Sequence, residues 1–393
     1  MANAPDLSRV TPEVADWFRD RQHSLHIGKT TISPAGHVVD WVPVESQGDG
    51  RLASPPPSTK ARVEGAKKDR PTTYADLDIG EDGPPGHVPI LRPDPTKLSG
   101  EQLMGHSSKR GGLLVNMNRA NKQPNDPNPT GYFHATSSET ATSYGCEAWL
   151  NVWDPGVNLP SSPGDDHSIS QTWLQNYQTA QTHSMEGGLT VDGGLNGDLA
   201  SHLFTYYTTN GYTGDGNNIG GYNRLHDGWR QYDASIYPGI RINGSSTSGG
   251  TQLEIAIKFQ LWQSNWWFGF NNDESGPWIW LGYYPATLFN DGLRDVAQWV
   301  SFGGEVYSAL ANPCATQDQM GSGRHAEAGW SYAAYQRNLR SQSDTGGGMV
   351  DLSAVPEVDA AASTCPTNEF TIQCFMNSGS GFASYQYYGG PLV

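Results

Sequence analysis

The chain has 393 residues, of which 24 are Lys or Arg and 40 are Asp or Glu, and its formal net charge is −16 at pH 7. An acidic balance of this size disfavours nucleic acid and anionic membranes as partners. No apolar run approaches the length of a membrane span, and the N-terminal stretch MANAPDLSRV lacks the basic and apolar regions of a signal peptide.

The charge is unevenly distributed, and this divides the chain near residue 130. Residues 1–130 hold 16 basic and 16 acidic side chains and no cysteine, whereas residues 131–393 hold 8 basic and 24 acidic ones and all four cysteines. The second part is large enough for a sizeable core. Its scarcity of cations suits a protein that works in acid, where protonated carboxylates leave most proteins strongly cationic. An ordinary acidic secreted domain explains the same charge equally well.

Residues 1–130 are predicted to be mostly irregular, with one short helix. Residues 11–26 fit a helix because Thr11 can serve as N-cap and Pro12 as the first helical residue. HVVDWVPVES and GHVPILR are short strand patterns, and residues 47–75 are Pro-rich and fit a flexible linker. A segment this polar is not expected to bury a large core alone. We therefore expect its strand-like pieces to pair with a sheet edge of the second part.

Residues 131–393 are predicted to form an antiparallel β-sandwich, so the fold class is all-β. LEIAIKFQLW alternates, with Ile255, Ile257 and Phe259 on one face and Glu254 and Lys258 on the other. Further aromatic or β-branched runs are HLFTYYTTNGY, ASIYPGIRI, WIWLGYYPATLF and FASYQYYG, and clusters of Gly, Asn, Asp and Ser separate them. Many short strands with turn signals between them are typical of sandwiches and barrels.

Two glutamates lie in strand patterns at positions where a charge is not expected. In SFGGEVYS the alternation puts Glu305 opposite the apolar face, and in HSMEGGLTVD it does the same for Glu186. Glu305 follows two glycines and Glu186 precedes two, so bulk is removed beside each carboxylate. If the two strands share a sheet, the carboxylates converge in a groove that admits an extended chain. Periodicity alone favours the plainer interpretation, two ordinary surface glutamates.

A pair of close carboxylates has a definite chemistry. The two cannot both ionise cheaply, so one keeps a proton beside its partner, and the pair provides a general base for water and a general acid for a leaving group. Peptide hydrolysis can use such a pair, and so can a sandwich-fold glycoside hydrolase. A further alternative is a lectin-like binding module, in which the tryptophans of NWWFGF at 265–270 bind the ligand.

The four cysteines allow three pairings, and their spacing cannot choose among them. Cys365 and Cys374 are close in sequence and suit a local disulfide, while Cys146 and Cys314 pair with each other or stay free. No CxxC or clustered Cys/His spacing indicates a zinc site. No metal and no other cofactor is predicted.

Six motifs occur in an order that resembles the neprosin family of glutamic endopeptidases: SISQTWL, SMEGGL, HLFTYYTTNGY, WIWLGYYPATLF, FGGEVY and QMGSGRHAEAG. In the first part, VVDWVPVESQ and GHVPILR resemble the activation segment of that family. The resemblance implies a secreted proenzyme that is processed in acid, with a β-sandwich catalytic domain. It also implies Glu186 and Glu305 as the catalytic pair and, from the known preference of the family, cleavage after proline.

We therefore expect a secreted, acid-active glutamic endopeptidase that acts on proteins or peptides. Residues 1–130 are its activation segment and intramolecular inhibitor, and residues 131–393 its peptidase domain. Gln171 is a candidate oxyanion donor, by analogy with glutamic peptidases that pair Gln with Glu, although a structural amide is the plainer interpretation. Trp173 shares the strand face of Gln171, and Tyr307 shares that of Glu305, so both are candidate substrate contacts. Which glutamate is the acid and which the base stays open.

The sequence departs from the family in two places. The family has Gly-Trp after its first glutamate, where this chain has Gly187, Gly188 and Leu189, and GGYNRLHDGW stands in place of the usual cysteine pair. The first difference bears on the preference for proline more than on the chemistry. The basic groups of residues 1–130 are expected to pair with carboxylates of the second part, so that acid weakens the pairing and releases the segment.

Overall fold

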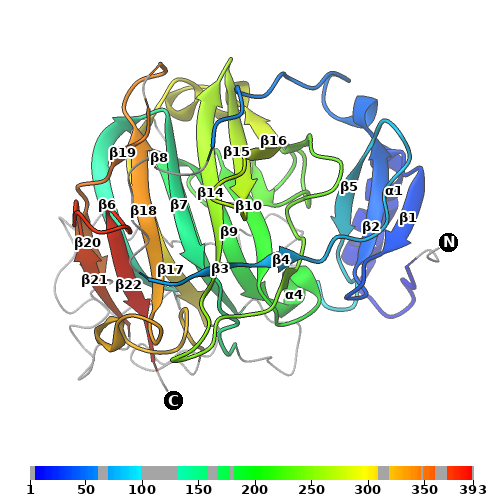
Figure 1. Cartoon of the computed structure of the whole chain (residues 1–393). Helices are drawn as coiled ribbons and strands as arrows, with labels where there is room; N and C mark the ends of the chain where they lie inside the picture. Colours follow the sequence, from blue (N-terminus) through cyan, green and yellow to red (C-terminus); the bar gives the residue numbers. More distant parts are fainter. Residues whose placement is uncertain are drawn as a thin grey trace.

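The computed structural model describes residues 5–60, 70–98, 132–157, 166–177, 181–308, 318–346, 348–358 and 370–391, with the backbone alone in 355–358. A body of two β layers carries a smaller N-terminal unit at one side (Figure 1). The all-β prediction is confirmed, and α1 (Pro12–Leu25) is the one long helix among the described residues. In this part of the chain no helix is long and apolar enough to cross a membrane.

Helix α1 begins where the sequence predicts. The side chain of Thr11 accepts a hydrogen bond from the backbone N–H of Val14, and Pro12 occupies the first turn. Phe18 is buried on the face that packs inward. The helix ends at His26, which has the left-handed conformation, with φ 52°, that commonly closes a helix.

The N-terminal unit is more regular than its sequence suggests. Strands β1 (Lys29–Ile32), β2 (Val38–Pro43) and β5 (His87–Arg92) form an antiparallel sheet in the order β1-β2-β5. The expectation that VVDWVPVES and GHVPILR would pair with the body is therefore wrong, because β2 and β5 pair with each other. Alternation shows that a stretch is a strand, but it does not show which strand lies beside it.

A buried ion network fixes α1 to this sheet. Asp40 of β2 is fully buried, and its carboxylate accepts hydrogen bonds from Arg21 Nη1 at 2.8 Å and Arg92 Nε at 3.0 Å. Arg21 also donates to the carbonyl oxygen of Leu91 at 2.9 Å. Buried charges are tolerated only when they are paired and hydrogen-bonded. The small unit therefore depends on this network as well as on its few apolar contacts.

The predicted linker at 47–75 contacts the body at several of its described residues. Gln47 is fully buried, and its side-chain amide exchanges two hydrogen bonds, of 2.9 and 2.8 Å, with the backbone of Gln231. Strand β3 (Thr73–Tyr74) pairs with β14 (Leu253–Trp262) of the body, and β4 (Asp76–Leu77) pairs with β13 (Ile242–Asn243). This stretch crosses the body as a blue band in Figure 1. Residues 61–69 are outside the described residues.

The first layer of the body is a seven-stranded sheet in the order β11-β10-β9-β8-β17-β6-β20, with antiparallel neighbours. Its strands are β6 (Tyr132–Ser143), β8 (His167–Asn176), β9 (His183–Asp192), β10 (His202–Thr208), β11 (Gly220–Tyr222), β17 (Ala297–Tyr307) and β20 (Val355–Val358). Strands β9, β8 and β17 are consecutive in the middle of this sheet. The two glutamate motifs are therefore separated by a single strand.

The second layer follows the order β12-β16-β15-β14-β7-β18-β22-β21, with β19 beside β18 and β3 beside β14. Its remaining strands are β7 (Gly145–Asn151), β12 (Arg230–Gln231), β14 (Leu253–Trp262), β15 (Asn265–Asn271), β16 (Ile279–Pro285), β18 (Ala334–Gln342), β19 (Val350–Asp351), β21 (Thr371–Phe375) and β22 (Tyr385–Gly389). Short helical turns are α4 (Gly193–Asn196), η1 (Val44–Ser46), η3 (Ala286–Phe289), η4 (Gly292–Arg294) and η5 (Ala326–Ala328).

The core lies between the two layers, because each sheet turns an apolar face inward. Ile255, Ile257 and Phe259 of β14 are in this core, as the alternation predicts. The four aromatic residues of NWWFGF in β15 are fully buried. They offer no exposed surface to a sugar, which removes the observation that favoured a lectin-like module.

The other face of β14 is buried as well, through charge pairing. Glu254 is fully buried and pairs with Arg337 at 2.8 Å, and Lys258 pairs with Glu147 at 2.7 Å. Alternation therefore predicted the face of these charged residues correctly. It did not predict their burial, because that depends on partners from strands distant in sequence.

Candidate active site

Glu186 and Glu305 lie on the same face of the seven-stranded sheet, opposite the core. Glu186 is in β9 and Glu305 is in β17, and β8 runs between them. The strand register puts Trp173 of β8 directly beside Glu186, and Ile169 directly beside Glu305. Because residues two apart in a strand share a face, Gln171 lies on this face between the two glutamates.

Gln171 is the centre of the arrangement. It lies directly between Gly188 of β9 and Gly303 of β17, so each glutamate is its diagonal neighbour on an adjacent strand. Its side-chain Nε2 donates a hydrogen bond to Oε2 of Glu305 at 3.3 Å. Its carbonyl oxygen accepts one from Gln336 Nε2 at 3.2 Å, which fixes the backbone at this point. The side-chain amide of Gln171 is therefore buried and directed at the carboxyl group of Glu305.

The four glycines beside the glutamates serve close packing. A Cβ added to Gly188 or to Gly303 would lie 2.7 Å from the Cα atom of the facing residue on the next strand. On the core face, a Cβ on Gly187 would lie 2.7 Å from the ring of Phe268. Real Cβ atoms do not approach other atoms this closely. The space that the sequence suggested for a substrate chain is thus occupied by neighbouring strands and core side chains.

Two histidines contact the carboxyl group of Glu305. His134 of β6 lies directly across from Glu305, with its Nε2 3.2 Å from Oε2, and His167 of β8 places its Nε2 3.1 Å from Oε1. Both rings are buried. Sequence reasoning missed both histidines, although alternation in β8 puts His167 on the same face as Gln171. Two imidazoles and one amide thus surround a single carboxyl group.

The carboxyl group of Glu186 has hydroxyl neighbours instead. The Tyr212 hydroxyl donates to its Oε1 at 2.7 Å, and the Ser184 hydroxyl donates to the same oxygen at 3.0 Å. Gln175 supports both, because its amide donates to the oxygens of Tyr212 and Ser184 at 2.9 and 3.3 Å. Burial, followed by the charge of Glu186, raises the pKa of Tyr212 well above its ordinary value. The tyrosine therefore remains a hydrogen-bond donor in neutral and acid solution.

Aromatic rings flank the glutamates on both sides of Gln171. The rings of Tyr307 and Tyr132 are 4.6 Å apart, next to the histidines of Glu305. On the other side, Trp173 packs with Trp299 and Tyr177. The two predicted substrate contacts, Trp173 and Tyr307, therefore lie on the glutamate face, at opposite ends of it.

The arrangement is closed in the full chain. The exposed fractions of Glu186, Gln171 and Glu305 are 0%, 0% and 1%. Catalysis on a peptide requires one carboxyl group to reach the attacking water and the other to reach the leaving nitrogen, each within hydrogen-bond distance. A protein substrate cannot reach the glutamates in this state of the chain.

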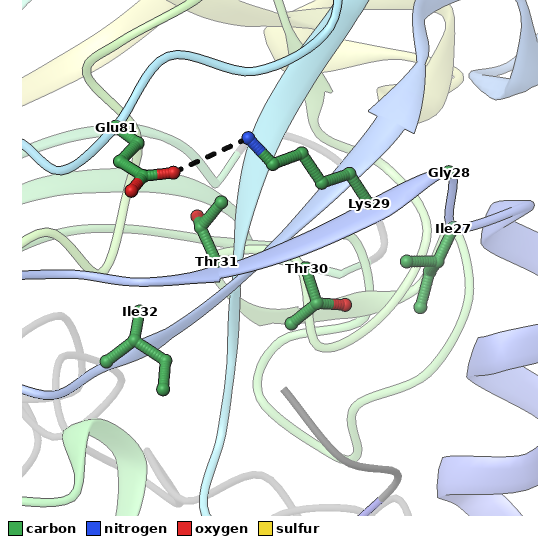
Figure 2. A pocket seen from close by; sticks show the side chains of 7 residues that line it. All are labelled: Ile27, Gly28, Lys29, Thr30, Thr31, Ile32 and Glu81. Atoms are coloured by element: carbon green, nitrogen blue, oxygen red, sulfur yellow. Dashed lines mark ion pairs between the residues drawn. The ribbon is translucent and has the colours of Figure 1, made fainter. Parts of the chain in front are cut away.

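The pocket in Figure 2 lies elsewhere, on the N-terminal unit. It is lined by residues 27–32, which include β1, and by Glu81. Lys29 and Glu81 approach each other across it, with 3.6 Å between Nζ and Oε2. An exposed ion pair of this kind is weakly held and solvated. The pocket has one carboxyl group and so cannot provide the paired acid and base.

The cysteines do not form the predicted bridge. Cys146 and Cys374 are free thiols, and the two partners that the sequence offered, Cys314 and Cys365, lie outside the described residues. Cys146 is fully buried, with its Sγ 3.2 Å from the hydroxyl of Thr172, and burial raises the pKa of its thiol to about 12. Burial likewise raises the pKa of Cys374 to about 12. The expected Cys365–Cys374 disulfide is therefore absent from this structure.

One group of described residues has the composition of a metal site, namely His37, Asp198 and His202. The sequence analysis missed it because His37 belongs to the N-terminal unit and the other two to the body. The spacing of Asp198 and His202, four residues apart at the start of a strand, was the only local signal. None of the three contacts Glu186 or Glu305 in a hydrogen bond or ion pair of the described residues.

Residues 164–391 match the family model described as Neprosin. Among solved structures, the chain is similar to SCP-B, titled a member of the Eqolisin family of peptidases in a complex with the tripeptide Ala-Ile-His. The identity is 12%, the match covers 67% of this chain and 98% of that one, and the TM-score is 0.29. A second match is a protein of unknown function from Saccharomyces cerevisiae, at 9% identity, 44% and 62% coverage and a TM-score of 0.20. Structural similarity at this level carries no argument.

Proposed function

Because the chain belongs to the neprosin family of peptidases, we propose that it is a glutamic endopeptidase in proenzyme form, with Glu186 and Glu305 as its catalytic pair. One observation carries the proposal: the two carboxyl groups share a sheet face and are the two diagonal neighbours of Gln171. An ordinary surface glutamate is exposed to solvent, whereas Glu186 and Glu305 are both buried and accept hydrogen bonds from neighbouring side chains.

The different surroundings of the two glutamates favour different roles. Three nitrogen groups, from His134, His167 and Gln171, are directed at the carboxyl oxygens of Glu305, whereas two hydroxyl groups are directed at Glu186. When two carboxyl groups have surroundings as different as these, one can act as the general acid and the other as the general base. We therefore assign Glu305 as the base and Glu186 as the group that holds the proton.

The reaction then proceeds in two proton transfers. Glu305 takes a proton from water as the water oxygen bonds to the peptide carbonyl carbon, and the carbonyl oxygen becomes an oxyanion. An amide nitrogen carries two N–H groups, so Gln171 can contact Glu305 and also donate to the oxyanion. Glu186 gives its proton to the leaving nitrogen as the C–N bond breaks. Exchange of one proton with solvent returns the pair to its starting state.

The buried site supports the proenzyme part of the proposal. A chain whose glutamates are inaccessible needs a rearrangement or a cut before it can act on protein. Residues 1–130 carry the resemblance to an activation segment, and we assign them as an inhibitor that is removed in acid near residue 130, outside the cell. The expected pairing of their Lys and Arg with carboxylates of the body is not found among the described residues, where His37–Asp198 is the one ion pair between the two parts.

The most specific part of the proposal is the substrate preference, namely cleavage after proline. It rests on the preference of the family and on the aromatic rings of Tyr132, Trp173 and Tyr307 beside the glutamates. Proline-rich peptides dock well between aromatic rings, because their extended helix is preformed and costs little entropy. The chain lacks the tryptophan that the family has after its first glutamate. Digestion of a mixed protein substrate in acid, with cut sites identified by mass spectrometry, measures the preference directly.

Substitution of each glutamate tests the pair. Glu186→Gln and Glu305→Gln should each lower peptide hydrolysis in acid by roughly 10²–10⁴-fold, with an unchanged circular dichroism spectrum. Glu139→Gln is the matched control, since Glu139 lies in β6 of the same sheet and is only half-buried. Near-wild-type turnover of either variant would rule out the pair.

Incubation of the full chain in acid tests the proenzyme assignment. The wild type should yield a fragment that starts near residue 130, while Glu305→Gln should remain full length if the cut is autocatalytic. Full activity without any N-terminal loss on a gel would contradict an inhibitory role for residues 1–130.

A further inference from the structure

His37, Asp198 and His202 meet where the N-terminal unit contacts the body. His37 lies just before β2 of the N-terminal sheet, whereas His202 begins β10 and Asp198 precedes it by four residues. One ligand atom from each of the three lies within 4.8 Å of the others. The three side chains therefore join two parts of the chain that no disulfide links among the described residues.

Both imidazoles point the same nitrogen at one carboxylate. His37 Nε2 lies 3.2 Å from Oδ2 of Asp198, and His202 Nε2 lies 2.9 Å from Oδ1. The rings are nearly perpendicular, with an angle of 88° between them and 5.0 Å between their centroids. Ligands about 2.0–2.1 Å from a tetrahedral ion are separated from one another by about 3.3 Å. The two nitrogen–oxygen distances are close to this value, and the two nitrogens lie within 4.8 Å of each other.

The hydrogen bond at the second nitrogen of His202 leaves the lone pair of Nε2 available to a cation. Its Nδ1 lies 2.8 Å from the carbonyl oxygen of Gly239, which can only accept, so the proton of a neutral ring is on Nδ1. The lone pair of Nε2 then faces an oxygen of Asp198, and two acceptors oppose each other. His202 is fully buried. A cation placed between this nitrogen and the carboxylate would be bound by both acceptors.

His37 repeats the pattern. Its Nδ1 lies 3.6 Å from Oδ2 of Asp78, and Asp78 is held in place by the hydroxyl of Ser33 and, at 3.0 Å, by the backbone N–H of Ala35. Histidines that bind metal through one nitrogen almost always direct the other to a carboxylate or a backbone carbonyl. His202 has such a support as a hydrogen bond to Gly239, and His37 faces Asp78 at an ion-pair distance that is longer than a hydrogen bond.

The surrounding charge favours a divalent cation. Asp78, Asp154 and Asp198 are opposed by Arg241, whose Nε lies 3.6 Å from Oδ2 of Asp198. With neutral imidazoles the cluster carries two excess negative charges. Arg241 is the one feature that works against metal binding, but its side chain is 36% exposed and can turn to solvent.

We propose that His37, Asp198 and His202 bind a divalent transition metal, with Zn²⁺ the best fit, and that this ion fastens the N-terminal unit to the body. Two imidazole nitrogens and one carboxylate oxygen suit Zn²⁺ and exclude the hard ions Ca²⁺ and Mg²⁺, which take oxygen ligands. Three protein ligands leave a fourth position for water. The inference does not depend on the catalytic assignment.

Calorimetric titration of the untagged full chain with ZnCl₂ near neutral pH tests this. The wild type should bind one equivalent, and His37→Ala and Asp198→Asn should each weaken binding by at least about tenfold. The control is His23→Ala, an exposed histidine of α1, which should bind as the wild type does. Zn²⁺ should also raise the unfolding temperature of the wild type and not of the two ligand variants, because it binds the folded form.

Absence of saturable binding by the wild type would overturn the proposal, and so would undiminished affinity of His37→Ala. Substitution with Co²⁺ provides an independent readout, since a tetrahedral site with nitrogen ligands should give a visible absorption band in the wild type that Asp198→Asn loses. Nitrogen NMR that found both nitrogens of His202 protonated after addition of Zn²⁺ would assign the cluster to a buried imidazolium instead.

Discussion

Replacing Glu254 by Gln should destabilise the body strongly, because Glu254 and Arg337 form a buried ion pair in the second sheet. The two carboxylate oxygens accept from Nε and Nη2 of Arg337 at 2.8 Å each, and the Tyr335 hydroxyl donates at 2.7 Å. Removing one member of such a pair leaves the other charge buried, which costs about 3–5 kcal/mol. Glu274 also contacts Arg337 and keeps part of the compensation, so we expect the lower end, about 3 kcal/mol.

The dependence on pH follows from the direction of the shift. Burial acts to raise the pKa of Glu254, but the charge and hydrogen bonds of Arg337 outweigh it, so the pKa is lowered in the folded chain. A lowered folded-state pKa contributes stability that is fully present above the unfolded value, about 4.3. That stability is lost as the pH falls through the folded-state value. The pair therefore remains intact in moderate acid, where we propose that the peptidase acts.

Urea unfolding followed by tryptophan fluorescence, near neutrality, at about pH 5 and at about pH 3, measures this. The deficit of Glu254→Gln should be the same at the first two pH values and smaller at the third. The control Glu139→Gln should change the free energy of unfolding by less than about 0.5 kcal/mol. Glu254→Leu with Arg337→Met should recover part of the loss, since an apolar pair replaces the ions at little cost. A deficit below about 1 kcal/mol near neutrality would refute the argument.

Three further outcomes are expected. Tyr212→Phe should lower the kcat of peptide hydrolysis in acid by about tenfold without unfolding the chain, because Glu186 loses one of its donors; an unchanged kcat would remove Tyr212 from the site. Gly303→Ala should lower the free energy of unfolding by more than about 2 kcal/mol in the same urea titration, because the added Cβ overlaps β6. The control Gly348→Ala should be neutral, because a Cβ at Gly348 enters open space. Cys146 should resist a thiol reagent in the native chain and react once urea unfolds it, since its thiol is buried and its pKa is about 12; rapid native labelling would contradict this.

The strands of the body could be predicted from sequence because each carries its own alternation. Ile255 and Ile257 face the core, and Glu186 and Glu305 face away from it, as the period of two requires. The helix at the N-terminus could be predicted in the same way, since Thr11 and Pro12 mark its start. These features are local, and a single stretch of chain contains all the information they need.

Partners across strands could not be predicted, because register depends on segments far apart in sequence. His134 and His167 reach Glu305 only because β6 and β8 lie on either side of β17. The same limit explains why β2 and β5 were wrongly assigned to the edge of the body. It also explains why a histidine of the N-terminal unit was not connected with Asp198.

The contacts between the N-terminal unit and the body bear on how the proposed segment could leave. Most are insensitive to pH: Gln47 and Gln231 exchange neutral hydrogen bonds, and β3 and β4 pair through the backbone. Protonation of carboxylates would not break these contacts. While the chain is intact, the segment is also held at a high effective concentration, which a cut removes. We therefore propose that cleavage near residue 130 comes before release, and that acid acts on the proposed catalytic pair and not on the adhesion of the segment.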